Sequence, residues 1–218
     1  MHIFRNTTRS STMKLIHIGR NYGEHIKELG NDLPAEPVVF LKPESALIPP
    51  YGPITLPTFS DDIHHEIELV YSIIRKNGKA VADKVTIGLD LTARTLQRQL
   101  KEAGLPWEKA KSFDGSAYVA SEFTALDSYP KGHHIDFMLK RNGKVVQSGH
   151  NGEMIFPIDA LISNVEKYML LETGDLIFTG TPSGVGVIED GDQLEGYLLG
   201  ELLFDLKVEK VKVKALAM

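Results

Sequence analysis

Alternation of apolar and polar residues with a period of two predicts that strands make up most of this chain. Residues 63–74 run toward Asn77-Gly78, and residues 137–149 surround Asn142-Gly143; an Asn-Gly pair favours a two-residue hairpin turn, so two hairpins are predicted. Shorter runs of branched apolar residues predict further strands within residues 13–19, 37–43, 46–57, 85–91, 175–182 and 197–216.

Helical spacing is confined to three segments. Residues 92–104 (TARTLQRQLKEAG) predict a helix with Thr92 as its N-terminal cap and Gly104 after its last turn. Residues 157–171 predict a second helix, and residues 20–30 predict one of barely two turns, which glycines flank as they would flank a lid. With no internal repeat or linker, these elements predict one β-rich α+β domain over residues 13–218.

Composition narrows the classes of function. The net charge of −5 over 218 residues has the wrong sign for a protein that binds nucleic acid through phosphates, and no apolar run approaches the roughly 18 residues of a membrane span. Because cysteine is absent, any metal must be held by oxygen or imidazole. Residues 1–12 lack a secretory signal and are expected to be a flexible arm or a misassigned start, which favours a cytoplasmic protein. The two arginines of this arm keep an organelle open as an alternative.

Three acidic residues are candidates for a metal site. In a strand, Glu66 and Glu68 point to the same side with Cα atoms about 6 to 7 Å apart, among apolar neighbours. Two desolvated carboxylates repel each other, so a hard cation such as Mg²⁺, Mn²⁺ or Ca²⁺ is expected between them. Asp90 lies at the end of a predicted strand, where functional side chains are frequent. The alternatives are a solvated strand face and, for Asp90, a helix N-terminal acid.

Two further groups could carry chemistry. His25 and Glu28 are three residues apart on the short helix, where a carboxylate can fix the tautomer of an imidazole that acts as a general base; both could also be plain surface residues. Arg94 and Gln97 share one side of their helix beside Asp90, while Lys111 follows in a loop and could equally be a surface lysine.

The glycine-rich segment 180–186 (GTPSGVG) is not a dinucleotide fingerprint, because no helix-forming run follows it. It is typical of a turn that offers backbone N–H groups and the Thr181 hydroxyl to an anion. With this turn included, the chain resembles the fumarylacetoacetate hydrolase family, most closely its short acylpyruvate hydrolase and oxaloacetate decarboxylase members. The resemblance rests on GRNYGEH (19–25), VVFLKP (38–43), HHEIEL (64–69), LDLTARTLQ (89–97), GLPWEKAKSFDG (104–115), MIF (154–156) and GDLIFTGTPSGVG (174–186).

The resemblance implies a mixed β-roll or sandwich with a few flanking helices, usually a homodimer. It implies that Glu66, Glu68 and Asp90 bind the metal and that His25 and Glu28 activate water. It assigns substrate or oxyanion binding to the following residues: Arg20, Arg94, Gln97, Lys111 and Thr181. Long family members have one more aspartate ligand ahead of the histidine. No counterpart is evident near His25, so a water is expected to complete the coordination.

The reaction expected is hydrolysis of a C–C bond in an acylpyruvate-like 2,4-dioxo acid, with Mg²⁺ as the first choice of cofactor. Family membership does not settle the reaction. Oxaloacetate decarboxylation, or isomerisation of a 2-hydroxyhepta-2,4-diene-1,7-dioate-type substrate, on the same metal site is the alternative. A more distant alternative is a non-catalytic β-domain that a cation stabilises.

Overall fold

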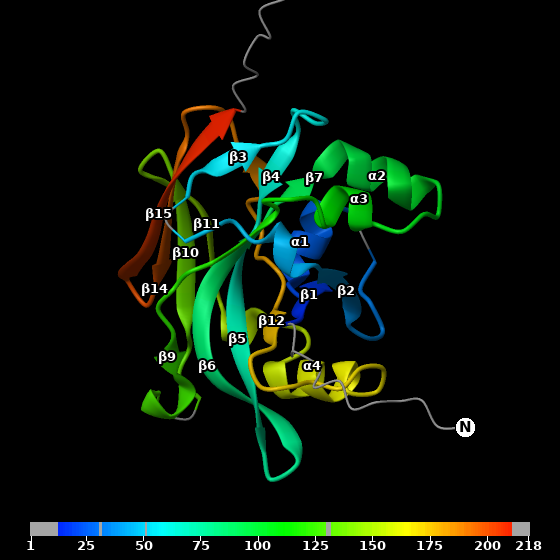
Figure 1. Ribbon diagram of the computed structural model, residues 1–218, viewed down its shortest axis with the longest axis vertical. Coiled ribbons are helices and arrows are strands. Elements are labelled where there is room, and N and C mark those ends of the chain that lie inside the picture. The colour runs from blue at the N-terminus through cyan, green and yellow to red at the C-terminus, as the bar shows by residue number, and fades with distance from the viewer. Residues whose placement is uncertain (1–12, 31, 51, 130–131, 211–218) are drawn as a thin grey trace, which may run out of the picture.

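A seven-stranded mixed sheet forms the centre of the molecule (Figure 1). The computed structural model describes residues 13–30, 32–50, 52–129 and 132–210, so the arm predicted at residues 1–12 lies outside the described residues. The main strand order is β2-β1-β12-β5-β6-β8, with β9 also paired to β6. These strands are β1 Leu15–Gly19, β2 Val38–Lys42, β5 Ile67–Lys76, β6 Lys79–Asp90, β8 Ala117–Val119, β9 Thr124–Ala125 and β12 Leu176–Phe178. Only the β1–β12 pair of this sheet is parallel in the described residues.

Two smaller sheets complete the β-structure of the described residues. A five-stranded sheet has the order β11-β10-β14-β15-β3, and a three-stranded sheet has the order β13-β4-β7. Their strands are β3 Ile54–Leu56, β4 Ile63–His65, β7 Thr92–Ala93, β10 Asp136–Arg141, β11 Lys144–His150, β13 Gly186–Val187, β14 Gln193–Leu198 and β15 Glu201–Lys210. Short 3₁₀ turns occur at Glu44–Ala46, Leu126–Ser128 and Asn151–Glu153.

The two predicted Asn-Gly hairpins are confirmed. Asn77 and Gly78 have φ angles of 52° and 77° between β5 and β6, and Asn142 and Gly143 have φ angles of 53° and 75° between β10 and β11. Positive φ at both central residues is the geometry of a type I′ turn, which matches the right-handed twist of paired strands. These turns set the register of the β5–β6 and β10–β11 pairings.

One predicted strand is divided in two. The run expected over residues 63–74 stops at His65 and resumes at Ile67, so that Glu66 lies between β4 and β5. β4 pairs with β7 and β13, whereas β5 pairs with β6 and β12. The chain therefore changes sheets at Glu66, which a hydrophobic period of two cannot reveal.

In the described part of the chain, four α-helices flank the sheets: α1 Gly23–Glu28, α2 Arg94–Glu102, α3 Glu108–Lys111 and α4 Ile158–Val165. The prediction that Thr92 caps α2 is wrong, because Thr92 belongs to β7. Instead, the backbone N–H of Thr95 donates to Oδ2 of Asp62 at 3.0 Å, so an acid remote in sequence satisfies the start of the helix. No helix among the described residues is long and apolar enough to cross a membrane.

The main core lies between the β5–β6 pair and the five-stranded sheet, and a second cluster lies under α4. In the second cluster, Leu161, Ile162 and Val165 of α4 pack against Ile16 and Ile177 of the large sheet. Figure 1 shows α1, α2 and α3 gathered near β1, β2 and β7, away from α4. The predicted fold class is confirmed: a β-rich α+β fold with curled sheets and a few flanking helices.

Candidate active site

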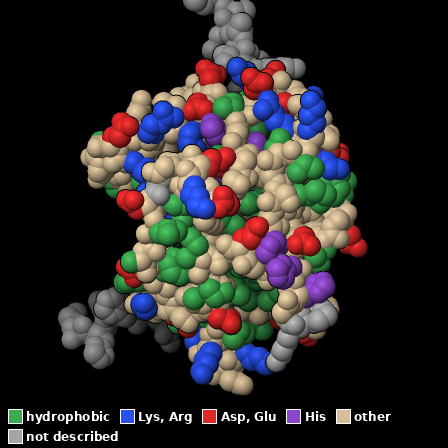
Figure 2. Space-filling view, turned by 180° about the vertical axis from the view of Figure 1, so that it is seen from behind, with side chains coloured by type: hydrophobic (Ala, Val, Ile, Leu, Met, Phe, Trp, Pro, Cys, Tyr) green, Lys and Arg blue, Asp and Glu red, His purple; other side chains and the backbone are tan. Residues whose placement is uncertain are grey.

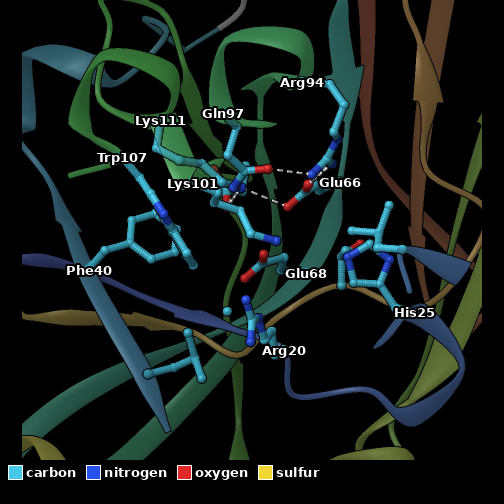
Figure 3. Close-up of a pocket in the computed structure, with 15 residues that line it drawn as sticks. Arg20, His25, Phe40, Glu66, Glu68, Arg94, Gln97, Lys101, Trp107 and Lys111 are labelled. Atoms are coloured by element: carbon cyan, nitrogen blue, oxygen red, sulfur yellow. Dashed lines mark hydrogen bonds and ion pairs between the residues drawn. The ribbon is translucent and has the colours of Figure 1, made fainter. Parts of the chain in front are cut away.

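A cavity of about 50 Å³ lies among α1, α2, α3 and the strands β1, β2, β5 and β6 (Figure 3). Its wall contains every predicted site residue except Glu28, which lies behind His25. The lining residues are Ile18, Gly19, Arg20, His25, Leu29, Phe40, Glu66, Glu68, Asp90, Arg94, Gln97, Lys101, Trp107, Lys111 and Thr181. Residues separated by more than 150 positions in the chain thus meet in one small space.

Strand register brings the three predicted carboxylates together. The antiparallel β5–β6 pairing sets Ile67 opposite Leu89 and Glu68 opposite Gly88. The backbone N–H of Asp90, the last residue of β6, then donates to the carbonyl oxygen of Glu66 at 2.9 Å. Glu66, Glu68 and Asp90 are only 4%, 1% and 1% exposed, so each carboxylate has lost most of its hydration and requires partners in the protein.

Cationic side chains already contact two of these carboxylates. Lys111 Nζ donates to Oε2 of Glu66 at 2.9 Å and to Oδ2 of Asp90 at 2.7 Å. On their other oxygens, the Arg94 guanidinium binds Glu66, and Lys42 Nζ lies 2.8 Å from Oδ1 of Asp90. Lys111 is therefore no surface lysine: it lies between two acids of the cluster.

These contacts separate the pKa values of the three acids. Burial alone would raise the pKa of Glu66, but the charges of Lys111 and Arg94 outweigh it and lower that pKa to about 2. Burial likewise opposes ionisation of Asp90, while Lys111 and Lys42 hold its pKa well below the usual value. The pKa of Glu68 is raised well above its usual value by burial and by the negative charges of Asp90 and Glu66. Glu68 is thus the acid whose ionisation would benefit most from an added cation.

The predicted His25–Glu28 pair is formed on α1. Nδ1 of His25 lies 3.0 Å from Oε2 of Glu28, and the backbone N–H of Gly184 donates to Oε1 of Glu28 at 2.9 Å. Glu28 therefore ties the short helix to the glycine-rich turn 180–186, and His25 is only 7% exposed beneath it. In Figure 3, His25 lies on one side of the cavity and Phe40 and Trp107 lie on the other, with Glu68 between them.

The predicted substrate-binding residues differ in how much of their bonding capacity remains. Nη1 of Arg94 donates to Oε1 of Gln97 at 2.7 Å, which orients both side chains on α2. The Thr181 hydroxyl donates to the carbonyl oxygen of Ile67 at 2.7 Å, so its proton serves to hold the turn beside β5. Arg20 has a φ of 58°, an uncommon conformation for a non-glycine residue, and its side chain lines the cavity.

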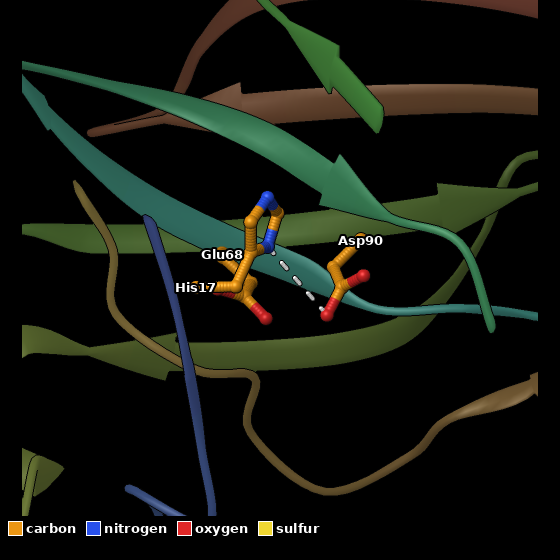
Figure 4. A group of neighbouring side chains, drawn as sticks. All are labelled: His17, Glu68 and Asp90. Atoms are coloured by element: carbon orange, nitrogen blue, oxygen red, sulfur yellow. Dashed lines mark ion pairs between the residues drawn. The ribbon is translucent and has the colours of Figure 1, made fainter. Parts of the chain in front are cut away.

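Two buried polar residues of this region were missed by the sequence analysis. Lys42 ends β2 and donates to the carbonyl oxygens of Leu91 and Ser116 in addition to its ion pair with Asp90. Burial lowers the pKa of Lys42 to about 8, an effect that Asp90 partly opposes. His17 lies in the middle of β1 (Figure 4), where burial lowers its pKa to about 4 against the opposing charge of Asp90. The only local signal for either residue is a polar side chain within an otherwise apolar strand.

The donor set fits a divalent cation. His17, Glu68 and Asp90 each offer a ligand atom, and these atoms lie within 4.8 Å of one another. Glu66 adjoins this group through the bridge that Lys111 makes to Asp90. A buried carboxylate with a raised pKa, such as Glu68, is typical of a site where a cation neutralises the charge.

Several known proteins are similar to this chain in sequence and in fold. A family model described as fumarylacetoacetate (FAA) hydrolase C-terminal matches residues 14–205. A Bos taurus protein named oxaloacetate tautomerase FAHD1, mitochondrial, is 39% identical over 90% of this chain and 91% of its own. A Dictyostelium discoideum protein named oxaloacetate decarboxylase, mitochondrial, is 38% identical over 90% of this chain and 95% of its own.

Among solved structures, a fumarylpyruvate hydrolase from Pseudomonas aeruginosa, in complex with Mn²⁺ and pyruvate, superposes with a TM-score of 0.81. It is 28% identical in sequence and the match covers 96% of this chain and all of that one (100%). The matched region contains the whole carboxylate cluster and the His25–Glu28 pair. The relatives are named for hydrolase, decarboxylase and tautomerase activities. From the family model, the sequence identity and the fold together, this chain belongs to the fumarylacetoacetate hydrolase family of enzymes.

Proposed function

We propose that this protein is a divalent-cation-dependent enzyme that acts on 2-oxo acids, with His25 as its base. The observation that carries the proposal is that His25, held by Glu28, shares one small cavity with the buried carboxylates Glu66, Glu68 and Asp90. A general base beside a cation site can transfer a proton to or from a carbonyl compound that the cation holds, or from a water molecule next to it.

Glu66, Glu68 and Asp90 would hold the cation. When bound, it would chelate the 2-oxo carboxylate and neutralise negative charge that develops on the oxo group. Oxygen ligands favour Mg²⁺ or Mn²⁺, and the Mn²⁺ in the fumarylpyruvate hydrolase structure supports a divalent ion. Mg²⁺, the first expectation from sequence, stays a prediction that titration with each metal will test.

The tautomer of His25 follows from its partner. The ionised carboxylate of Glu28 can only accept a hydrogen bond, so Nδ1 of His25 carries the proton and Nε2 has a lone pair available as a base. The second oxygen of Glu28 is held by the N–H of Gly184, which keeps the carboxylate, and through it the imidazole, in one orientation.

In C–C bond hydrolysis of an acylpyruvate, His25 takes a proton from water, and the hydroxide oxygen attacks the distal carbonyl carbon. Gln97 and Lys111 stabilise the oxyanion, a type of contact typically worth about 3 to 4 kcal/mol of barrier. The C–C bond then breaks, its electron pair passes to the pyruvate half, and the proton on His25 returns to that carbon. Arg20 and Arg94 bind the carboxylate end of the substrate, and Thr181 supports the turn beside it.

Oxaloacetate is the second candidate substrate, and one observation favours it. The relatives with 39% and 38% identity are named for oxaloacetate tautomerase and decarboxylase activities. In tautomerisation, His25 would remove a proton from C3 of oxaloacetate and the oxo oxygen would gain one. Decarboxylation would need no attacking water at all.

The test is a steady-state panel of acetylpyruvate and oxaloacetate with Mg²⁺ and with Mn²⁺, following pyruvate release and the ultraviolet absorbance of the enol. His25→Gln and Glu28→Gln should retain cation binding and lose turnover by orders of magnitude. Undiminished turnover in His25→Gln, or in protein stripped by a chelator, would overturn the proposal. A cation that raises stability without turnover of any oxo acid would indicate the non-catalytic alternative.

Three organisational proposals accompany this function. The chain is proposed to fold as a single domain over residues 13–218 and to form a homodimer, which limited proteolysis and light scattering will test. A cytoplasmic location stays a prediction. The mitochondrial names of the bovine and Dictyostelium relatives make imaging of the tagged full chain, with and without residues 1–12, the deciding experiment.

A further inference from the structure

His17 is a buried imidazole that the proposed reaction does not use. It lies at the centre of β1, is 0% exposed and has both ring nitrogens without a hydrogen-bond partner in the described part of the chain. Buried polar groups are almost always hydrogen-bonded, because an unpaired donor or acceptor loses its hydration without compensation. The imidazole of His17 is therefore a buried polar group whose hydrogen-bonding capacity is not satisfied by the described residues.

Packing does not explain the choice of histidine at this position. The ring stacks on Phe178 with centroids 3.9 Å apart and on Phe40 with centroids 5.3 Å apart. A phenylalanine would fill the same space between the two rings without burying unpaired nitrogens. The stacking does, however, fix the plane of the imidazole, so its nitrogens have set directions.

One of those directions leads to the carboxylate cluster. Nδ1 of His17 lies 3.7 Å from Oδ2 of Asp90, which is too long for a hydrogen bond (Figure 4). A ligand atom from each of His17, Glu68 and Asp90 lies within 4.8 Å of the other two. Two carboxylate oxygens and an imidazole nitrogen at such separations are the start of a mixed coordination sphere, in which one cation contacts all three.

We propose that His17 is a ligand of the catalytic cation and takes a coordination position that was expected to belong to water. The proposal rests on the cation site of the proposed function and adds a nitrogen to its oxygen ligands. Glu66 remains beside the cation with one oxygen held by Arg94 and the other by Lys111. His17 is eight residues ahead of His25, on the strand that enters the site first, so the ligand and the base belong to one continuous segment.

A nitrogen ligand changes which metal the site prefers. Mg²⁺ and Ca²⁺ are hard ions that favour oxygen donors, whereas imidazole suits transition metals, whose affinities rise from Mn²⁺ through Fe²⁺ to Co²⁺. The site should therefore prefer Mn²⁺, Fe²⁺ or Co²⁺ to Mg²⁺. This preference is a property of His17 and is separate from the question of which 2-oxo acid is turned over.

The first experiment requires no variant. Full-length protein labelled with ¹⁵N only in histidine is loaded with Mn²⁺, and pulsed electron paramagnetic resonance compares it with unlabelled protein. A coupling to Mn²⁺ that changes from that of ¹⁴N to that of ¹⁵N identifies an imidazole ligand. His25→Gln should keep this coupling, because His25 lines the cavity as the proposed base and is not assigned to the cation. Bound Mn²⁺ without any histidine coupling would overturn the proposal.

The second experiment uses His17→Phe, which keeps a stacked ring and removes both nitrogens. Loss of a group that only supports a metal ligand typically lowers metal affinity by roughly 10- to 100-fold, and loss of a ligand itself should cost at least as much. Isothermal titration should therefore show at least this decrease for Mn²⁺, with a much smaller change for Mg²⁺. An unchanged ratio of the two affinities would overturn the proposal. Should this variant fail to fold, His17→Leu and the labelling experiment still decide the question. Glu68→Gln separates the two hypotheses: if it abolishes Mn²⁺ binding while His17→Phe leaves the Mn²⁺ affinity unchanged, the cation site stands and only the role of His17 fails.

Discussion

Lys111 forms ion pairs with two acids of the cavity, Glu66 and Asp90. Replacing it with methionine tests how much the buried negative charges of these acids depend on its positive charge. The ammonium group donates to Glu66 at 2.9 Å, to Asp90 at 2.7 Å and to the Thr92 hydroxyl at 2.6 Å, and the residue is only 3% exposed. Lys111→Met fills a similar volume and leaves two buried carboxylates with one cationic partner fewer each.

The expected cost follows from those contacts. Removing one partner of a buried ion pair typically costs about 3 to 5 kcal/mol, because the other charge stays buried. Glu66 retains Arg94 and Asp90 retains Lys42, so the lower end of that range, about 3 kcal/mol, is expected for EDTA-treated protein at pH 7. Urea unfolding, followed by tryptophan fluorescence and circular dichroism, measures this loss.

A divalent cation should reverse part of the defect. The cation replaces the lost positive charge, so Mn²⁺ should stabilise Lys111→Met more than wild type. For scale, a ligand at 100 times its Kd adds about 2.7 kcal/mol to the free energy of unfolding of any protein that binds it only when folded. Lys109→Met, an exposed lysine on the same helix, is the matched control and should change stability by less than about 0.5 kcal/mol. A loss below about 1 kcal/mol in Lys111→Met, the size of a surface ion pair, would refute the reasoning.

Stability in acid, the start of α2 and the packing of β6 provide three more tests. Burial lowers the pKa of His17 from 6.5 to about 4, so as the pH falls the unfolded chain protonates this histidine before the folded protein does. The free energy of unfolding should therefore decrease as the pH falls from about 6.5 to about 4. His17→Phe should remove up to about 3 kcal/mol of that loss in urea titrations of EDTA-treated protein, and identical pH profiles would contradict this. Asp62→Ala removes the acceptor for the Thr95 N–H at the start of α2 and should lower the free energy of unfolding by about 1 kcal/mol. It should also lower kcat/KM at unchanged cation affinity. An unchanged urea midpoint would argue against the cap. Gly88→Ala places a Cβ 2.3 Å from the Tyr118 carbonyl oxygen and should cost about 1 to 3 kcal/mol in thermal unfolding, whereas a neutral result would mean that β6 and β8 separate easily.

The parts of the fold and site that were predictable have local signals. Asn-Gly pairs predicted the turns of both long hairpins because positive φ at two successive residues is a property of those residues themselves. Glu66 and Glu68 were predicted to share one side because alternation is a property of extended chain, and both line the cavity although the strand breaks at Glu66. His25 and Glu28 contact each other because three residues span one helical turn.

The parts that were not predictable depend on contacts between distant segments. Asp62 rather than Thr92 satisfies the start of α2, and the Asp62–Thr95 contact joins positions 33 residues apart. Lys42 and His17 lie beside Asp90 although the strand order puts β12 and β5 between β1 and β6. A single sequence does not encode that order in any local pattern, so a lysine and a histidine in apolar strands could be noticed but not paired.

Charge balance reconciles the predicted and observed roles of Lys111. Asp90, Glu66 and Glu68 bring three potential negative charges, against which Lys42, Arg94 and Lys111 bring three positive ones. A divalent cation held by these carboxylates would take over the role of the Lys111 ammonium as their counter-ion, and the excess positive charge would favour an anionic ligand. Lys111, which lines the cavity, would then be available to an oxyanion that forms there. Binding of the cation and of the oxo acid should consequently strengthen each other by the same factor, since such coupling is reciprocal.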